Sequence, residues 1–423
     1  MNILNLATTD ENAAGVASRN VNEMFLELNH NSVLLVKQSG SNRRNVIALE
    51  KKPTNTFFSR YKKRIIDKWN EYAGKLNPLL KDHKYSFHSV NEKKKQTSGA
   101  TILNNTPFKP DVILIFWVSG FVNSRTIKEL SAIAGCKIFL LMTDNAPLTG
   151  GCHYPWNCAG FHTDCSNCPA ILTESKKKIA SENLAYKKEN LPASIELIAG
   201  SESDYRRALK ASIFKGKKIH KLIAPIDHNR FKPGDKAAAR AHFGINSTQK
   251  IIFFGATSLS DPRKGVQYFL DALTILKEQL NGASIDFLIL LAGKEGFEPF
   301  RNKGISIKEI GYLNEDSLIM AYQAADFAVS PSLEDSGPMM VNQCIMCGTP
   351  MVTFHTGVAM DLVITGQTGY SAKLFDTTDF AKGLQYLLLL NDTETKEIAI
   401  RCRNHALATI TPEVYAKNLT SLF

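Results

Sequence analysis

The chain has 423 residues, of which 44% are hydrophobic and 22% are charged; this composition is typical of a globular protein and excludes a disordered chain. No apolar run reaches the roughly 18 residues that a membrane-spanning helix needs, and the start lacks the basic and apolar regions of a secretory signal, so we expect a cytosolic protein. The net charge of +11 at pH 7 indicates an anionic partner, such as a nucleotide phosphate, a nucleic acid or an anionic membrane face.

Short apolar runs alternate with helical patterns in the first half, which predicts βαβ units and a parallel sheet. Strands are expected at MNILNLAT, SVLLVK, DVILIFW, KIFLLMTD, ASIELIAGS and KIHKLIAPI. A loop followed by a helix is expected at residues 12–30, and an irregular lysine-rich insert at residues 74–105. A further helix is expected at TESKKKIASENLAYKK.

The same rhythm begins again in the second half, which predicts a second α/β domain joined to the first near residues 205–230. Strands are expected at KIIFFGAT, IDFLILLAG, the end of DSLIMAYQAADFAVSPS and TPMVTF. Helices are expected at KGVQYFLDALTILKEQL, at the start of DSLIMAYQAADFAVSPS, at PMMVNQCIMCG and over the last thirty residues.

Residues 57–72 (FFSRYKKRIIDKWNEY) predict an amphipathic helix with one apolar stripe surrounded by Lys and Arg. The pattern is typical of a helix that lies on an anionic membrane surface, and also of a surface helix whose stripe faces the core. The chain carries no known nucleic-acid-reading motif and no strand that interleaves aromatic and basic residues, so we expect no nucleic-acid partner.

The segment TDNAPLTGGCHYPWNCAGFHTDCSNCP is rich in cysteine and histidine. Its cysteines are Cys152, Cys158, Cys165 and Cys168. In a reducing compartment clustered thiols are typically metal ligands or redox groups, and the final CxxC pair suits tetrahedral zinc. We expect a structural zinc ion, because four thiolates leave no open position for catalysis. Reduced or pairwise-bridged thiols and plain buried residues remain alternatives. His153 and His162 are spare ligands, and His153 could equally point into the catalytic cleft.

Four blocks in the second half occur in a characteristic order and spacing: APIDHNRFKP, FFGATSLSDPRKGVQYFLDAL, AADFAVSPSLEDSGPMMVNQCIMCGTPMV and GQTGY. Together they resemble the retaining glycosyltransferases of family 4. In the first half, TGGCHY and the cysteines that follow resemble a subgroup that builds bacterial surface polysaccharides. The resemblance extends from the first strand to about residue 390.

The resemblance implies an α/β protein with the GT-B fold, in which two Rossmann-like domains face each other across a cleft. Residues 1–205 would form the acceptor-side domain, with a Cys-rich loop at 150–170. Residues 206–395 would form the domain that binds the nucleotide sugar. Residues 396–423 would form a helical segment that packs back toward the N-terminal domain.

The donor phosphates need cationic groups and backbone N–H groups. Arg263 and Lys264 lie in a loop that opens a helix at Gly265 and could supply both. The alternative is an ordinary surface loop. Relatives usually carry an Arg soon after the preceding strand, where this chain has GATS, so Arg263 is the expected substitute. Near the N-terminus, Ala14 and Gly15 stand where relatives have a glycine pair, in a loop that would lie under the donor phosphates or the acceptor, so Gly15 is the one glycine kept there.

The stretch SLEDSGPMMVNQ predicts a strand end, a tight turn and a helix. Ser336 could cap that helix, so that its first N–H groups face the site. Gly337 lets the backbone approach a ligand closely, and Pro338 completes the turn. We expect all three residues to bind the nucleotide sugar; the alternative is a capped helix with exposed acidic residues.

The resemblance assigns roles to the acidic positions around this turn. Asp335 would contact the donor sugar and Gln343 would hold the ribose hydroxyls. Both depart from the pair of Glu residues that relatives carry, and Glu334 could take over part of the acidic role. In the first half, relatives have a His-Asp dipeptide where this chain has Thr143 and Asp144. Asp144 follows a strong strand and is our candidate for contacting the sugar or the acceptor; a turn or cap residue is the alternative.

These features, together with the resemblance, predict a glycosyltransferase that moves a sugar from a nucleotide diphosphate sugar to a glycan acceptor. The resemblance implies a retaining reaction with no catalytic cofactor and no essential divalent cation. The subgroup resemblance implies a lipid-linked acceptor at the inner face of the cytoplasmic membrane, in polysaccharide, capsule or O-antigen biosynthesis. The departures at Thr143 and Gln343 motivate a second hypothesis, a glycosyltransferase-like binding or scaffold subunit without turnover. Turnover of any donor would exclude it.

Overall fold

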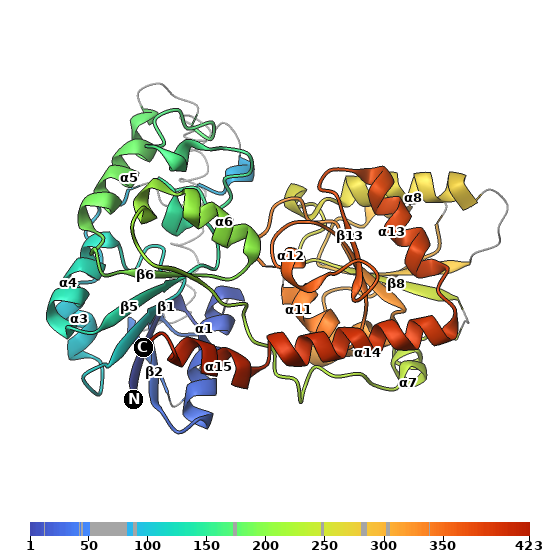
Figure 1. Ribbon diagram of the computed structural model, residues 1–423, viewed down its shortest axis with the longest axis horizontal. Coiled ribbons are helices and arrows are strands. Elements are labelled where there is room, and N and C mark those ends of the chain that lie inside the picture. The colour runs from blue at the N-terminus through green and yellow to red at the C-terminus, as the bar shows by residue number, and fades with distance from the viewer. Residues whose placement is uncertain are drawn as a thin grey trace, which may run out of the picture. The chain divides into compact units, whose positions relative to one another are not determined.

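Two parallel β-sheets organise the computed structural model, one in each of two units (Figure 1). The first unit contains Met1–Gly200, Asp204–Leu222 and Thr420–Phe423, and the second contains Ser201–Ser203 and Ile223–Leu419. The structure describes residues 1–11, 13–41, 43, 45–50, 83–87, 91–171, 176–246, 249–280, 286–301, 305–337 and 339–423. The amphipathic helix predicted at residues 57–72 lies outside these ranges.

Within the described residues, the first sheet has strand order β3-β2-β1-β4-β5-β6-β7, and each pairing is parallel. The strands are β1 (Asn2–Thr9), β2 (Asn31–Gln38), β3 (Val46–Glu50), β4 (Val112–Ile115), β5 (Lys137–Leu141), β6 (Glu196–Ala199) and β7 (Ile219–Lys221). The central strands are continuous apolar runs with fully buried residues such as Leu4, Leu35 and Ile113. Such runs are typical of a parallel sheet that is covered on both faces.

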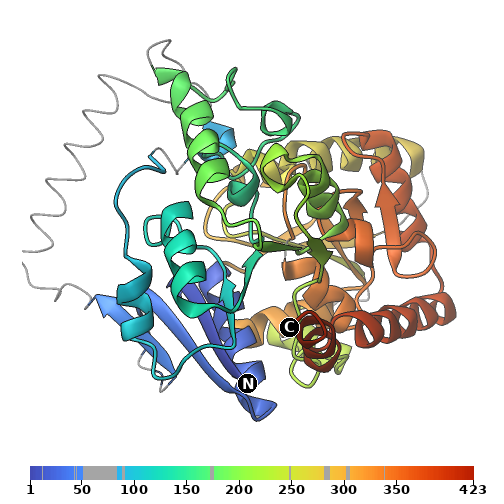
Figure 2. The ribbon, with the colours of Figure 1, turned by 60° about the vertical axis from the view of Figure 1, so that its left-hand side comes forward.

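Helices connect the strands of the first sheet. They are α1 (Ala13–Glu27), α3 (Gly99–Asn104), α4 (Ser124–Ala134), α5 (Lys178–Asn190) and α6 (Glu202–Lys210), with 3-10 turns η1 (His83–Tyr85), η2 (Ala146–Leu148), η3 (Gly160–His162) and η5 (Ser212–Phe214). The side chain of Asn123 accepts the Thr126 N–H (3.0 Å) and caps the start of α4, and Gly135 ends this helix in the left-handed conformation. The two helices α3 and α4 lie side by side (Figure 2).

The last residues of the chain belong to the first unit. The ring of Phe423 packs against the fully buried rings of Phe25 and Phe139, with centroids 6.3 and 5.7 Å away. The ammonium group of Lys137 donates to the carbonyl oxygen atoms of Leu422 (2.6 Å) and Phe423 (3.1 Å). Apolar packing and hydrogen bonds therefore both hold this segment.

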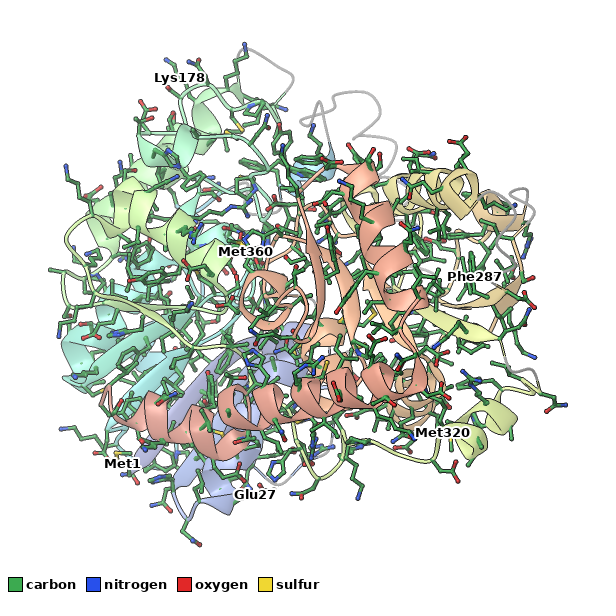
Figure 3. The ribbon with its side chains drawn as sticks, turned by 45° about the vertical axis from the view of Figure 1, so that its right-hand side comes forward. Met1, Glu27, Lys178, Phe287, Met320 and Met360 are labelled. Atoms are coloured by element: carbon green, nitrogen blue, oxygen red, sulfur yellow. The ribbon has the colours of Figure 1, made fainter. Side chains whose placement is uncertain are left out.

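The described strands of the second sheet have the order β10-β9-β8-β11-β12-β13 and are parallel throughout. They are β8 (Lys250–Gly255), β9 (Phe287–Ala292), β10 (Ile307–Glu309), β11 (Phe327–Ser330), β12 (Met351–Phe354) and β13 (Gly369–Ala372). Figure 3 labels Phe287 at the start of β9 and Met320 on the neighbouring helix α10 (Glu315–Ala324).

The other helices of this part of the chain are α7 (Lys236–His242), α8 (Val266–Leu280), α9 (Glu298–Arg301), α11 (Met339–Met346), α12 (Ala359–Leu362), α13 (Thr377–Leu388), α14 (Asp392–Thr409) and α15 (Pro412–Thr420), with the 3-10 turn η6 (Pro262–Lys264). The helices α8 and α13 pack side by side (Figure 1). A capping box between Asn391 and Glu394 begins α14. None of the helices in the described ranges is both long and apolar enough to cross a membrane.

Two doubly wound parallel sheets confirm the predicted α/β fold class. In each sheet the chain adds strands on one side of its first strand and then returns to add strands on the other side, so the strand order reverses between β1 and β4 and between β8 and β11. Ligands of open α/β sheets bind outside the carboxyl ends of the strands at such a reversal. The loops after these four strands are therefore where a site is expected.

Candidate functional site

The loop after β8 is locked against the loop after β11. Gly265 has a φ of +63°, and a Cβ atom built there would lie 1.9 Å from the carbonyl oxygen of Pro331. The N–H of Leu333 donates to the carbonyl oxygen of Arg263 (2.7 Å). Only glycine permits both the left-handed backbone and this approach, so the two loops that flank the strand reversal form one platform.

We expect Gly265→Ala to lower the free energy of unfolding of the second unit by about 3 kcal/mol, because the substitution combines a left-handed alanine with a clash against backbone. The matched control is Gly311→Ala, since Gly311 has a φ of +70° and open space around it; its cost should be about 1 kcal/mol. Urea unfolding of both variants measures the difference. Equal losses would contradict the close approach of the two loops.

Lys264 and Asp335 meet on this platform. The Nζ of Lys264 lies 2.6 Å from Oδ2 of Asp335, and their side chains are 23% and 12% exposed. The other carboxylate oxygen of Asp335 accepts the N–H of Gly337 (3.3 Å). The structure thus brings together the predicted phosphate-binding cation and the predicted sugar-binding carboxylate, one from each side of the strand reversal.

Arg263 is held within its own loop. Its guanidinium pairs with Asp261, and the same carboxylate accepts the Arg263 backbone N–H (3.0 Å) to cap the turn η6. In this arrangement the charge of Arg263 is partly balanced by Asp261. The expected contact of Arg263 with phosphate stays a prediction. Of the two cations, Lys264 is the one that reaches the loop after β11.

The turn between β11 and α11 is mostly buried. Glu334 is 2% exposed and Ser336 is 6% exposed. A Cβ atom at Gly337 would meet only an ordinary contact, 3.7 Å from Val358, so packing alone does not require glycine there. Pro338 lies outside the described residues. The ligand roles predicted for these positions stay predictions.

Gln343 is fixed by a residue that the sequence analysis missed. The Oε1 atom of Gln343 on α11 accepts the hydroxyl of Tyr322 on α10 (2.8 Å). Burial raises the pKa of Tyr322 well above its usual range, so the phenol remains a neutral donor. Because its oxygen is engaged, Gln343 would offer its amide N–H groups to a ligand. No local sequence signal marks Tyr322, which lies in an apolar helical pattern.

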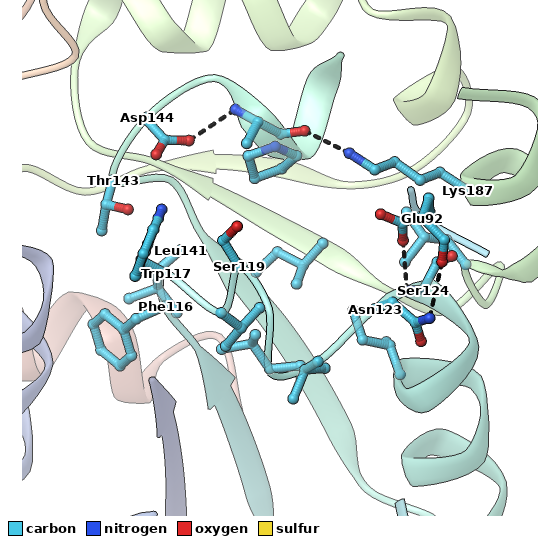
Figure 4. Close-up of a pocket in the computed structure, with 18 of the residues that line it drawn as sticks. Glu92, Phe116, Trp117, Ser119, Asn123, Ser124, Leu141, Thr143, Asp144 and Lys187 are labelled. Carbon is cyan, nitrogen blue, oxygen red and sulfur yellow. Dashed lines mark hydrogen bonds between the residues drawn. The ribbon is translucent and has the colours of Figure 1, made fainter. Parts of the chain in front are cut away.

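A pocket of about 100 Å³ lies in the first unit at the carboxyl ends of β4 and β5 (Figure 4). Its apolar wall includes Phe116, Trp117 and Leu141, and its polar lining includes Thr143 and Asp144. A mainly apolar cavity with a few convergent polar groups is the usual form of a small-molecule site. The structure therefore places Asp144 in a cavity and at the strand end where the sequence predicted it.

Asp144 forms a buried pair with His153. Oδ2 of Asp144 lies 2.7 Å from Nδ1 of His153, and the residues are 6% and 3% exposed. Oδ1 of Asp144 accepts the N–H of Ala146 (2.8 Å). A carboxylate at Nδ1 fixes the tautomer and the orientation of an imidazole ring. Of the two positions expected for His153, a spare zinc ligand or a side chain that points into the cleft, the structure has it lining the pocket as the partner of Asp144.

Lys187 fixes the loop that carries Asp144. Its ammonium group is buried and donates to the carbonyl oxygen atoms of Ala146 (2.8 Å) and Thr149 (3.0 Å). Figure 4 shows the resulting chain from Asp144 through Ala146 to Lys187. Lys187 was not predicted, because a lysine within a lysine-rich helix gives no sign that it is buried.

Gly15 lies inside α1 and not in a loop before it. A Cβ atom there would be 2.2 Å from the carbonyl oxygen of Thr9. The glycine therefore lets α1 pack directly on the carboxyl end of β1. This packing accounts for glycine without a ligand, so its expected role under the donor phosphates stays a prediction.

The four clustered cysteines line a second, smaller cavity of about 20 Å³ in the first unit. These residues, Cys152, Cys158, Cys165 and Cys168, are free thiols. Burial raises the pKa of Cys152 to about 12 and that of Cys165 to about 11. Across the described residues, no group of three or more His, Cys, Asp or Glu side chains is already arranged to hold a metal ion. The predicted zinc ion stays a prediction.

The second unit matches a known family over most of its sheet. Residues 248–389 match the model of the family described as Glycosyl transferases group 1. This stretch of the second unit is similar to the group 1 glycosyltransferases. It includes the loops after β8 and β11, so Lys264, Asp335 and Gln343 all lie in the matched residues.

Curated relatives are similar to this chain over part of their length. The D-inositol 3-phosphate glycosyltransferase of Mycobacteroides abscessus is 27% identical over 176 residues, which make up 39% of this chain and 38% of that protein. D-inositol 3-phosphate glycosyltransferase 2 of Catenulispora acidiphila is 26% identical over 249 residues, or 54% of this chain and 58% of that protein. The chain thus matches less than two thirds of either relative.

Solved structures resemble the whole chain in fold. A sucrose-phosphate synthase of Thermosynechococcus elongatus superposes with a TM-score of 0.63 at 14% identity, covering 100% of this chain and 98% of that one. Anabaena HepE, solved in complex with UDP-glucose, gives a TM-score of 0.57 at 13% identity, with 100% coverage of both chains. WaaG, a glycosyltransferase involved in lipopolysaccharide biosynthesis, gives 0.56 at 12% identity, with 98% coverage of both. The shared fold is that of the GT-B glycosyltransferases, as predicted.

Proposed function

We propose that the protein is a retaining glycosyltransferase that moves a sugar from a nucleotide diphosphate sugar to a glycan acceptor. The observation that carries the proposal is the pairing of Lys264 with Asp335 (2.6 Å) on the platform formed by the loops after β8 and β11. This pair lies at the strand reversal of the second sheet, inside the stretch that matches the group 1 glycosyltransferases. A cation and a carboxylate at one point suit a ligand that carries phosphate and hydroxyl groups.

Different residues of this platform would bind different parts of the donor. Lys264 would neutralise the diphosphate, and Glu334 or Asp335 would hold hydroxyl groups of the sugar. Gln343, oriented by Tyr322, would donate to the ribose hydroxyls. Two structures of HepE, a protein of the same fold, were solved with UDP and glucose and with UDP-glucose, which supports a nucleotide sugar as the donor.

The reaction breaks the bond between the anomeric carbon and the diphosphate oxygen and forms a bond from the acceptor oxygen to the same face of that carbon. The leaving phosphate takes the proton of the acceptor hydroxyl. Negative charge therefore grows on the diphosphate in the transition state. A fixed cation such as Lys264 stabilises that charge more strongly in the transition state than in the bound substrate, which is the condition for catalysis. The reaction as proposed needs no divalent cation and no catalytic cofactor.

The pocket of the first unit is the proposed position of the acceptor or of the transferred sugar. Asp144 and His153 would bind hydroxyl groups there, and the apolar wall would pack against the pyranose face. We further propose a lipid-linked acceptor of polysaccharide, capsule or O-antigen biosynthesis, supported by the TGGCHY motif and by the fold shared with WaaG. Residues 57–72 would then bind an anionic membrane surface. Failure to sediment with phosphatidylglycerol vesicles would exclude that role.

A nucleotide-sugar panel tests the central proposal. The full chain is incubated separately with UDP-glucose, UDP-galactose, UDP-N-acetylglucosamine, GDP-mannose and GDP-fucose, and release of nucleoside diphosphate is measured. We expect slow release from one donor, because water replaces the missing acceptor. Tight nucleotide binding without release, in the presence of lipid-linked glycan acceptors as well, would favour the scaffold alternative. Absence of any nucleotide binding would contradict both.

A further inference from the structure

We propose that the pocket at the carboxyl ends of β4 and β5 selects an acceptor sugar that carries an N-acylamino group, such as an acetamido group. The inference rests on the proposed function, because it takes the ligand of this pocket to be the acceptor sugar. The volume of about 100 Å³ is smaller than that of a pocket for a whole drug-sized ligand and well above the space that one water molecule needs. The cavity therefore admits one part of a larger ligand.

One end of this pocket is formed by the first turn of α4 and by residues next to it. We call it the helix end, and its lining residues are Glu92, Val122, Ser124 and Ile127. Figure 4 shows Glu92 and Ser124 close to each other and well apart from Asp144. The helix end therefore meets a different part of a bound sugar from the part that meets Asp144.

Ser124 brings a buried hydroxyl group to the helix end. The residue is 3% exposed, and its Oγ atom has no hydrogen-bond partner among the described residues. A buried polar atom without a partner is unfavourable, and a ligand group that supplies the partner removes that cost. The side chain of Asn123 does not supply it, since it already caps α4 and donates to the carbonyl oxygen atoms of Glu92 and Lys94. The Ser124 hydroxyl can thus donate to a carbonyl group of a ligand.

Glu92 brings a fixed carboxylate to the same end. Its Oε1 atom accepts the N–H of Ser124 (2.8 Å), and its own N–H donates to Oδ1 of Asn183 on α5 (3.0 Å). These bonds hold Glu92 against both helices. Within the described part of the chain, the second carboxylate oxygen, Oε2, accepts no hydrogen bond, so it can accept one from a ligand.

A hydroxyl donor beside a carboxylate acceptor suits a secondary amide. The amide N–H donates to Glu92, and the amide carbonyl accepts from Ser124. The acyl methyl group meets apolar side chains, because Ile127 follows Ser124 by three residues and lies on the same face of α4. Val122, which is also buried, lines the same end. Both polar groups of the helix end then have a partner, and its apolar wall is covered.

Other common substituents of a sugar match the helix end less well. A hydroxyl group could bond to Ser124 or Glu92, but it would leave the apolar side chains of Val122 and Ile127 uncovered. The carboxylate of a uronic acid would face the carboxylates of Glu92 and Asp144, which both line the pocket. An ammonium group would place a charge against the apolar wall. Of these groups, the amide alone satisfies both the polar and the apolar lining.

Binding of simple glycosides tests the inference without any turnover. Methyl glycosides of N-acetylglucosamine, N-acetylgalactosamine and N-acetylmannosamine, and of their parent hexoses, are titrated into the full chain, and binding is followed by saturation-transfer NMR. We expect one acetamido glycoside to bind at least about tenfold more tightly than its parent hexoside, because the parent lacks the amide and its methyl group. The acetyl methyl protons should receive the strongest saturation. Equal binding within every matched pair, or no binding of any acetamido glycoside, would overturn the inference.

Two variants test whether the amide lies at the helix end. Glu92→Gln keeps an oxygen for the Ser124 N–H but replaces Oε2 with an N–H donor, and Ser124→Ala removes the hydroxyl group. Each should lower the affinity for the acetamido glycoside about tenfold and leave that for the parent hexoside within about twofold. A merely structural role would lower both affinities alike. The matched control is Ser131→Ala, on the same helix but outside the pocket lining, which should change neither affinity.

The outcomes separate this inference from the proposed reaction. An acetamido glycoside that binds to a chain unable to turn over any donor would support the inference and count against the proposed function. Donor turnover without any preference among the glycosides would support the function and overturn the inference. Binding or turnover that requires the acetamido group on the nucleotide sugar, with no binding of the methyl glycosides, would place this group on the transferred sugar and overturn its assignment to the acceptor.

Discussion

Lys264→Ala is expected to lower the rate of donor turnover about 100- to 1,000-fold, the usual effect of removing one group that stabilises developing charge. Lys264 reaches Asp335 from the opposite side of the strand reversal, where the diphosphate of the proposed donor would lie. Since charge grows on this group as the sugar leaves, the loss should fall mainly on kcat. The nucleoside diphosphate release assay, run with the donor that the panel selects, measures it.

The matched control is Lys382→Ala, which removes an exposed lysine from α13 of the same unit. It should leave turnover within about twofold, because an exposed lysine contributes little. Lys264→Ala should also lower the free energy of unfolding by about 1 to 3 kcal/mol, since it leaves the largely buried carboxylate of Asp335 without its partner; turnover is therefore compared under conditions in which urea unfolding shows both proteins to be folded. Turnover that survives Lys264→Ala unchanged would remove Lys264 from the proposed site.

Asp144→Asn is expected to lower turnover about 100-fold, because it replaces the carboxylate that orients His153 with a neutral amide and small misplacements of a site residue have effects of this size. The substitution keeps the shape of the side chain. It should also lower the free energy of unfolding by about 2 kcal/mol, the contribution of a hydrogen bond to a charged group. Both quantities are measured on the same preparation.

A double-mutant cycle measures the interaction free energy between Asp144 and His153 separately from the contacts that each makes with other residues. We expect Asp144→Asn and His153→Gln to be non-additive in stability, with a coupling of about 1 kcal/mol or more, because the two side chains lie 2.7 Å apart. The control is Glu182→Gln, an exposed carboxylate on α5 whose pair with Lys93 lies at the surface; it should change neither turnover nor stability. Additive effects would mean that the two residues act independently.

The sequence predicted the central strands well, for a physical reason. A strand that is buried on both faces of a parallel sheet has to be a continuous apolar run, so DVILIFW and KIIFFGAT could be recognised without neighbours. The edge strands β3, β10 and β13 were not predicted. Apart from Gly369 and Ala372 of β13, their residues are half-buried or exposed, and they follow no strict pattern. Their conformation comes from pairing with a neighbouring strand, which a local pattern does not contain.

The residues of the candidate site likewise fall into those that a local pattern or the resemblance marked and those that only a distant contact defines. Lys264 and Asp144 were predicted because each follows a recognisable strand at the carboxyl edge of a sheet, and Asp335 was predicted because the resemblance assigns a role to its position. Lys187 and Tyr322 were missed because each acts through a contact with a residue distant in the sequence. His153 was expected either as a spare zinc ligand or as a residue that points into the cleft, but its partner was not predicted. Its bond to Asp144 depends on how the loop between them turns back, which spacing alone does not determine.

The link between the loops after β8 and β11 has a consequence for how tightly a ligand can be held. Gly265 and the bond from Leu333 to Arg263 fix Lys264 and Asp335 before any ligand arrives. A flexible loop would lose conformational entropy on binding, and that loss would weaken the complex. A platform that is already ordered avoids most of it. Most of the interaction free energy then remains available to distinguish one nucleotide sugar from another.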